Sequence, residues 1–244
     1  MTAEQIIVLV LEIVGTIAFS ISGAFVAIKA GLDLFGVSFV GSVTAVGGGI
    51  MRDIIVGDTP PRVFDNLHFL IVAVVVSLVT FAIIYFHQNG FEKIERRTEQ
   101  INNIFDAVGL AVFSVIGTET AFTHNLSDNV VLSLCLGLLT GVGGGIVRDV
   151  LTASTPYIFK KRIYALASLF GCLTYYVLRH TIPLSSIASI IAVIVIVSLR
   201  MLATHFLWNL PKITLMQKTT SQGNNDVQSK QELDAESLDV QQNS

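Results

Sequence analysis

Two stretches of this chain repeat one another: residues 47–60 read GGGIMRDIIVGDTP, and residues 143–156 read GGGIVRDVLTASTP. At an offset of 96 positions, eight of the fourteen residues are identical. Both stretches lie inside long apolar segments, where charged pairs are rare and commonly functional. A glycine-interrupted hydrophobic segment that occurs twice is typical of membrane transport proteins built from an internal repeat.

The composition independently indicates a membrane protein. Hydrophobic residues make up 52% of the 244 positions, charged residues only 14%, and the mean hydropathy is +0.70. Soluble domains carry about 25% charged residues, so we expect an integral membrane protein. The sequence has no nucleotide-binding, hydrolase or metalloprotease motif, no Cys/His cluster and no sizeable basic patch. We therefore expect no enzyme activity, no cofactor or metal, and no nucleic-acid partner.

Taking about 20 apolar residues for each membrane crossing, the sequence predicts seven spans in an all-α fold. The longest polar break before the tail, residues 88–100, divides them into two halves. Residues 1–208 form the predicted transmembrane domain, and the polar residues 209–244 a disordered tail. The predicted spans are residues 5–28, 35–57, 67–86, 102–123, 130–152, 161–178 and 184–207.

The distribution of Lys and Arg over alternate loops predicts the orientation. The side of the N-terminus carries Arg62 and Arg179, whereas the other side carries nine basic residues. By the positive-inside rule, the N-terminus lies outside and the tail lies in the cytoplasm.

The repeat extends upstream of the glycines at an offset of 94 positions. The first and fourth spans share the pattern Gly15, Phe19, Ser20, Gly23 and Gly109, Phe113, Ser114, Gly117. The repeat unit is therefore three spans, with repeat one at about 5–86 and repeat two at about 102–178. An odd number of spans inverts the second copy in the membrane, and the seventh helix at about 184–207 has no counterpart.

The glycine triplets are predicted to break or bend the second and fifth spans. Each glycine in a helix interior costs about 1 kcal/mol relative to alanine, and three in succession favour a break. The alternative is that the glycines only let two helices approach closely. The residues concerned are Gly47, Gly48, Gly49, Gly143, Gly144 and Gly145.

A charged pair follows each triplet, Arg52 with Asp53 and Arg148 with Asp149. We interpret them as two stations, one for each mouth of a permeation path, with interfacial snorkelling as the alternative. Adjacent helical residues point about 100° apart, so each charge is expected to need a partner on a neighbouring helix. Arg200 is expected to snorkel to lipid headgroups.

Four hydroxyl residues at matched positions could also face the path. Ser20 matches Ser114, and Thr44 matches Thr140 three residues before each triplet. Such hydroxyls either hydrate a passing ion or bond to the carbonyl four residues earlier, and the sequence leaves both readings open.

The doubled GGGxxRD motif with its following Thr-Pro resembles the prokaryotic branch of the trimeric intracellular cation (TRIC) channel family, also described as a bacterial glycine-transporter family. The resemblance covers residues 5–208. It implies a homotrimer in the lipid bilayer of a bacterial inner membrane. Each subunit would hold its own K⁺ or Na⁺ pore, bent at the glycine triplets and constricted near Arg52, Asp53, Arg148 and Asp149. The alternative it implies is a transporter of glycine.

Overall fold

The computed structural model describes residues 3–86, 95–160, 163–182 and 184–206, and these residues form helices and connecting turns without a strand. The predicted tail, 209–244, lies outside the described residues. The helices are α1 (Ala3–Lys29), α2 (Leu34–Val56), α3 (Arg62–Asp65), α4 (His68–Phe86), α5 (Glu95–Thr123), α6 (Val130–Leu151), α7 (Tyr157–Lys160), α8 (Ile163–Thr181) and α9 (Ser185–His205).

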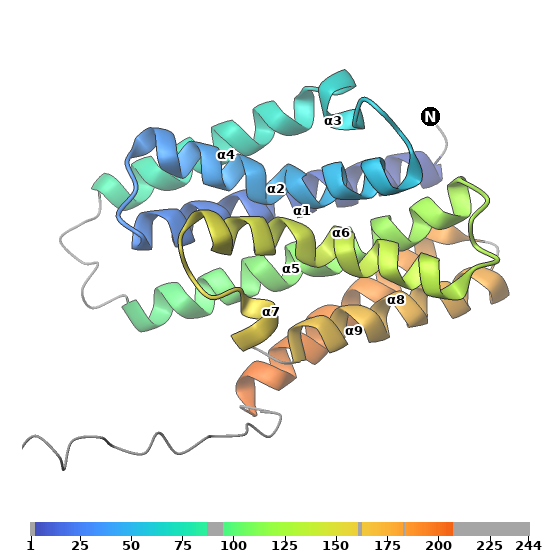
Figure 1. Ribbon diagram of the computed structural model, residues 1–244. Coiled ribbons are helices and arrows are strands. Elements are labelled where there is room, and N and C mark those ends of the chain that lie inside the picture. Colours follow the sequence, from blue (N-terminus) through green and yellow to red (C-terminus); the bar gives the residue numbers. More distant parts are fainter. Residues whose placement is uncertain (1–2, 87–94, 161–162, 183, 207–244) are drawn as a thin grey trace, which may run out of the picture. The chain divides into compact units, whose positions relative to one another are not determined.

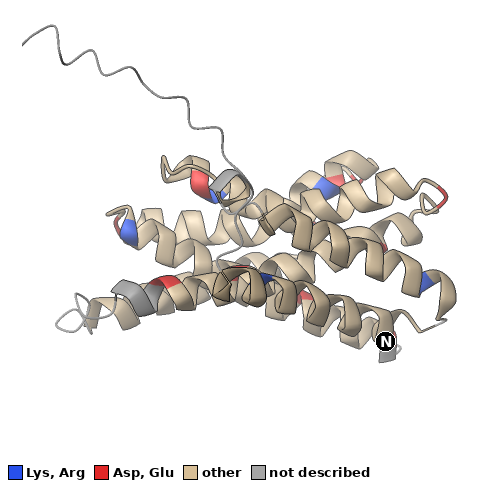
Figure 2. Cartoon of the chain, turned by 90° about the horizontal axis from the view of Figure 1, so that it is seen from below, with Lys and Arg blue, Asp and Glu red and all other residues tan. Residues whose placement is uncertain are grey.

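Six of the described helices are long and apolar enough to cross a membrane: α1, α2, α4, α5, α6 and α9. Helix α8 occupies the position of the predicted sixth span but is not among the six, because its tyrosines and the terminal Arg179 and His180 lower its hydropathy. The all-helical membrane fold is thus confirmed, and the crossing by α8 stays a prediction. Charged residues are few along the helices (Figure 2).

Helices α1, α2, α5 and α6 pack together at the centre of the described bundle. Helix α4 packs on α1 and α2, and helices α8 and α9 pack on α5 and α6 (Figure 1). In the most apolar part of α5, 78% of residues are buried, against 17% for α4. Helix α4 therefore presents most of its surface outward, with an apolar stripe suited to lipid at Ile71, Val75, Val79 and Ile83.

Helices α2 and α6 run without interruption through the glycine triplets, so the predicted breaks are wrong. The glycines serve a close crossing instead. A Cβ added to Gly48 would overlap the backbone oxygen of Thr140, and one added to Gly144 would overlap that of Thr44. In an apolar environment no water competes for the helical hydrogen bonds, so a glycine run can stay helical while two backbones approach.

The crossing is reciprocal between the two repeats. Gly48 meets Thr140 as Gly144 meets Thr44, and both pairs are related by the offset of 96 positions. Likewise, Gly15 lies against the ring of Phe113, and Gly109 against the ring of Phe19. Reciprocal contacts of this kind are what a two-fold relation between the repeats requires.

Candidate functional site

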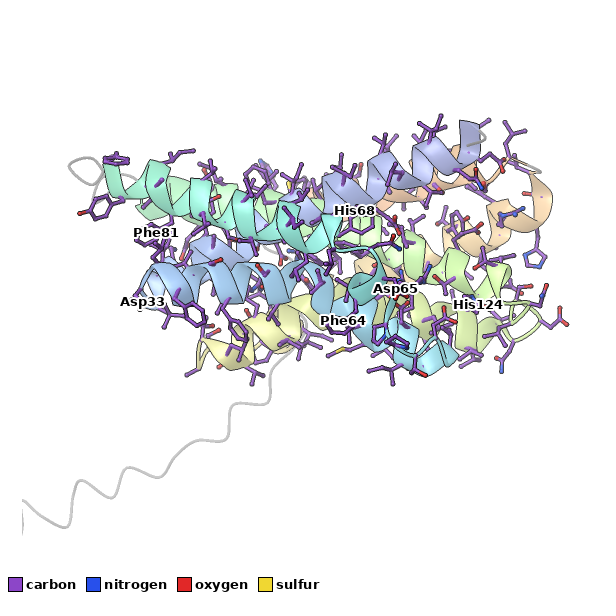
Figure 3. All side chains as sticks on the ribbon, turned by 90° about the horizontal axis from the view of Figure 1, so that it is seen from above. Asp33, Phe64, Asp65, His68, Phe81 and His124 are labelled. Atoms are coloured by element: carbon purple, nitrogen blue, oxygen red, sulfur yellow. The ribbon has the colours of Figure 1, made fainter. Side chains whose placement is uncertain are left out.

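The first charged site lies at the end of α2. Helix α2 ends at Gly57, whose φ of 85° turns the chain, and the loop then returns to α3. Asp53 Oδ2 accepts a hydrogen bond from the backbone N–H of Arg62, the first residue of α3, at 3.0 Å. The carboxylate of Asp53 therefore fixes the returning loop beside α2. Phe64 and Asp65 belong to α3, and His68 begins α4, the next helix along the chain (Figure 3).

Two arginines converge on the other oxygen of Asp53. Arg52 donates to Oδ1 from Nε and Nη2 at 2.9 and 2.8 Å, and Arg62 donates from Nε and Nη2 at 3.2 and 2.9 Å. Arg52 and Asp53 therefore bond to each other, and the expectation that each motif needs a further partner on a neighbouring helix is confirmed here, because Arg62 of α3 bonds to Asp53 as well.

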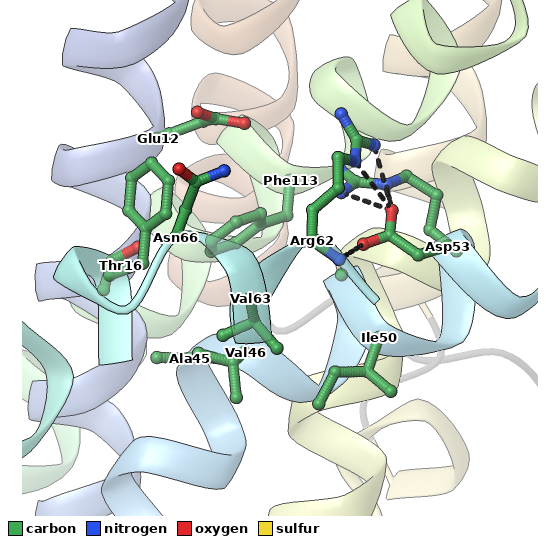
Figure 4. A pocket seen from close by; sticks show the side chains of 13 residues that line it. Glu12, Thr16, Ala45, Val46, Ile50, Asp53, Arg62, Val63, Asn66 and Phe113 are labelled. Carbon is green, nitrogen blue, oxygen red and sulfur yellow. Dashed lines mark hydrogen bonds and ion pairs between the residues drawn. The ribbon is translucent and has the colours of Figure 1, made fainter. Parts of the chain in front are cut away.

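A cavity opens beside this ion pair, with about 130 Å³ of space for water-sized groups (Figure 4). Its polar lining includes Arg52, Asp53, Arg62, Asn66 and Glu12 of α1. The space admits several water molecules or a partly hydrated ion. The two arginines and two carboxylates of the lining have equal and opposite formal charge.

The second charged site, at the end of α6, is also buried but is more tightly enclosed. Arg148 donates from Nε to Asp149 Oδ1 at 2.8 Å and from Nη1 to Asp106 Oδ1 at 2.8 Å and to Ser22 Oγ at 2.7 Å. Asp149 Oδ2 accepts from the backbone N–H of Tyr157, the first residue of α7, at 2.7 Å. The hollow beside Arg148 has no space for a water-sized group.

Asp106 of α5 joins this site to α9. Its Oδ2 accepts from Arg200 Nη2 at 3.2 Å, and the same nitrogen donates to Asn103 at 3.1 Å. Arg200 is buried, so the expected snorkelling to headgroups is wrong, because a carboxylate inside the bundle is a closer partner. Nη2 of Arg148 and Nε of Arg200 have no hydrogen-bond partner among the described residues.

Aromatic rings cover both buried arginines. The guanidinium of Arg148 lies 4.9 Å from the ring centre of Tyr157, and that of Arg200 lies 4.5 Å from the ring centre of Tyr164. Burial raises the pKa of Tyr157, which keeps its phenol neutral beside the ion pairs. The rings exclude water from charges that are already paired.

Glu12 and Asp106 are two acidic residues of these sites that were not among the residues predicted from the sequence. Both could have been found from the repeat itself, because Asp106 stands 94 positions after Glu12, the offset that relates Gly109 to Gly15. In each repeat, an acidic residue precedes the first matched glycine by three positions. The structure places each of them beside the arginine of the adjoining GGGxxRD motif.

The four hydroxyl residues are buried and bonded. Ser20, Thr44 and Thr140 each donate to the carbonyl four residues earlier, at 2.7, 2.6 and 2.6 Å. Ser114 shares a hydrogen bond of 2.7 Å with Ser168 of α8. In this conformation the hydroxyl hydrogens bond to helix carbonyls or to another hydroxyl, and all four side chains are fully buried.

The third glycine of each triplet lies beside the arginine that follows it. A Cβ at Gly49 would meet Arg52 at 3.8 Å, an ordinary contact, whereas one at Gly145 would lie 3.2 Å from the hydroxyl of Tyr164. Gly47 and Gly143 face the opposite triplet across the crossing. The six glycines thus extend from the crossing of α2 and α6 to both charged sites.

The sequence matches known proteins along most of its length. A family model described as "Glycine transporter" matches residues 9–85 and again 103–180, one match for each predicted repeat. The UPF0126 inner membrane protein YadS of Escherichia coli (strain K12) is 37% identical over 207 residues, covering 84% of this chain and 95% of YadS. A UPF0126 membrane protein of Vibrio cholerae is 34% identical over 161 residues, 66% of this chain and 64% of its own length.

Solved structures with the same fold are described as TRIC channels. A prokaryotic TRIC channel crystallised in 0.5 M KCl matches with a TM-score of 0.74 and 32% identity, over 84% of this chain and all of that one. The TRIC orthologue from Rhodobacter sphaeroides matches with a TM-score of 0.74 and 27% identity, over 82% and 98%. The likeness covers the helices that carry both charged sites.

Proposed function

This chain belongs to the family described as glycine transporter and shares its fold with prokaryotic TRIC channels, and from this premise we propose that it conducts monovalent cations, K⁺ and Na⁺, across a bacterial inner membrane. The route runs between α1, α2, α5 and α6, past the crossing of the glycine triplets. Each subunit of a homotrimer holds one such route, with the N-terminus outside and the C-terminus in the cytoplasm.

One observation carries the proposal: two repeat-related charged sites flank the crossing, and only one of them opens into a cavity. Water-sized space adjoins Arg52 and Asp53, whereas the space beside Arg148 and Asp149 is filled. A route that is hydrated at one end and sealed by ion pairs at the other is what a non-conducting state of a channel requires. Rearrangement of the Arg148 ion pairs then opens it.

The charges and oxygens along the route suit a cation of single charge. The guanidiniums of Arg52 and Arg62 would repel it, but Asp53 and Glu12 offset them. Because α2 and α6 are continuous, their backbone carbonyls stay in the helical hydrogen bonds. Cation ligands in this cavity therefore come from side chains and water.

Transport of glycine is the second candidate function, and the charged lining of the cavity is the observation that supports it. Arg52 and Arg62 offer donors suited to a carboxylate, and Glu12 in the same cavity suits an ammonium group. Glycine carries both charges on a molecule small enough for this space.

The deciding experiment compares the two candidates on one preparation. Purified protein is reconstituted into planar bilayers under a K⁺ gradient and into liposomes loaded for uptake of labelled glycine. Discrete K⁺ currents without saturable glycine uptake are expected. Saturable glycine uptake without K⁺ current would favour the transporter over the channel. The absence of both signals would overturn both candidates.

Replacing the buried charge tests the assignment of the site. The variant Arg148→Met removes the guanidinium but keeps a long side chain, and we expect altered opening of the K⁺ conductance. Lys29→Met, at the end of α1 and away from both charged sites, serves as the control for loss of one positive charge. Equal conductance of wild type and both variants would remove Arg148 from the route.

A further inference from the structure

Glu12 differs from every other carboxylate at the two charged sites. It is half-buried in the middle of α1, and it makes no hydrogen bond or ion pair with any of the described residues. Figure 4 shows its carboxylate apart from the marked bonds that join Asp53 to the arginines. A carboxylate withdrawn from bulk water without a partner is unfavourable, and such groups inside membrane spans are functional by default.

Asp53 cannot supply a ligand in this cavity. Its Oδ1 accepts from both Arg52 and Arg62, and its Oδ2 accepts from the backbone of Arg62. A cation that approached Asp53 would meet two guanidiniums that bond directly to it, whereas Glu12 interacts with the same guanidiniums only at longer range. Glu12 is the carboxylate of this lining that is not already held by an arginine.

In the second repeat, the acidic residue at the matching position is bonded to arginines. Asp106, the counterpart of Glu12, is fully buried between Arg148 at 2.8 Å and Arg200 at 3.2 Å. The first repeat holds its second arginine elsewhere, because Arg62 is the first residue of α3 and bonds to Asp53. This difference in partners leaves Glu12 uncommitted.

Glu12 also lines a second cavity, of about 90 Å³. Arg62 is the other residue that lines both cavities. The second cavity lies toward α5 and α9, where Glu119, Thr120, Thr123 and Ser189 add further oxygen atoms. Glu119 is held by Tyr175 at 2.5 Å and Arg179 at 3.5 Å. Glu12 is thus the carboxylate that both cavities share, and it forms no hydrogen bond or ion pair with the described residues.

We propose that Glu12 is the residue that binds the permeating single positive charge, with Thr16 and Asn66 as neighbouring oxygen donors in the same cavity. The inference rests on the proposed function and extends it to a specific binding residue. The bound group is an alkali cation if the protein is a channel, or the ammonium of an amino acid if it is a transporter. A single carboxylate beside a neutralised ion pair suits one positive charge better than two.

The test uses the full chain in proteoliposomes, with K⁺ flux and glycine uptake measured for wild type, Glu12→Gln and Glu12→Asp. Gln keeps the size and removes the charge, so we expect the half-saturating K⁺ concentration to rise about tenfold. Asp keeps the charge, so most of the affinity is expected to return. Glu4→Gln, exposed at the start of the same helix, controls for the loss of one negative charge from α1 and is expected to match wild type.

The possible outcomes separate this inference from the proposed function. Wild-type flux with unchanged half-saturation in Glu12→Gln would overturn the role of Glu12 and leave the channel in place. Glycine uptake that falls in Glu12→Gln without any K⁺ flux would place the ammonium group at Glu12. No saturable transport of either solute by wild type would overturn both. Because Glu12 bonds to none of the described residues, Glu12→Gln is expected to keep the melting temperature of wild type, which checks that it folds.

Discussion

The two GGGxxRD motifs have the same residues, buried in both cases, but the first borders a cavity and the second does not. At the first, Arg52 and Asp53 lie beside water-sized space together with Arg62, whose side chain is 44% exposed; at the second, Arg148 and Asp106 are fully buried and no water-sized space remains. The difference comes from the residues that surround the motif. Helix α3 supplies Arg62, the second arginine of the first site, whereas α9, which has no counterpart in the first repeat, supplies Arg200 to the second.

In both copies of the motif the contacts of the aspartate are the same, whereas those of the arginine differ. In both copies, the aspartate accepts from the backbone N–H at the start of the next short helix and from the arginine before it. These contacts fix the turn after α2 and after α6. The remaining donors of the arginine are free to bond differently, which allows one site to be hydrated and the other sealed.

The largest expected effect is that of Asp106→Asn at the sealed site. It leaves two buried arginines with one charged partner fewer, which destabilises proteins by about 3–5 kcal/mol. The matched change Glu12→Gln at the open site is expected to have little effect on stability. Thermal unfolding in detergent measures both, and equal melting temperatures would mean that the two acidic residues are equivalent.

The glycine crossing comes next. Gly144→Ala places a methyl group on the backbone oxygen of Thr44, and we expect a loss of about 1–3 kcal/mol as α2 and α6 separate. Gly49→Ala is the control, because its methyl group would meet Arg52 at 3.8 Å without overlap. Unfolding of the two variants in the same detergent gives the comparison. A larger loss for Gly49→Ala would contradict the close crossing.

A smaller effect on stability than that of the glycine change is expected for Arg62→Ala at the open site. Its partly exposed ion pairs contribute at most about 1 kcal/mol, and Asp53 keeps its bonds to Arg52. The change enlarges the cavity. The probe is the variant Gly49→Cys, whose thiol is expected to react faster with a thiol reagent in the presence of Arg62→Ala than without it. Cys135, which is exposed, is replaced by serine beforehand. An unchanged reaction rate would show that Arg62 does not limit access.

The sequence predicted the helical membrane fold and the residues of both charged motifs, because apolar length and an internal repeat are local properties of the chain. It did not predict that Arg200 is buried, because the position of Arg200 near the end of its span is also that of an interfacial anchor. Its burial follows only from the packing of α9 on α5. The glycine triplets were misjudged for a related reason. Helix propensity favours a break, whereas the partner backbone that rewards a close crossing lies 96 positions away in the sequence.

The sequence by itself determined that this protein is a helical membrane protein with a doubled arginine and aspartate motif. Only the tertiary structure decided that one copy is open and the other sealed. Identical motifs carry identical local preferences, but the energy of a charge inside the bundle depends on which side chains surround it. Those neighbours, Arg62 at one site and Asp106 with Arg200 at the other, come from elements that the motif does not contain.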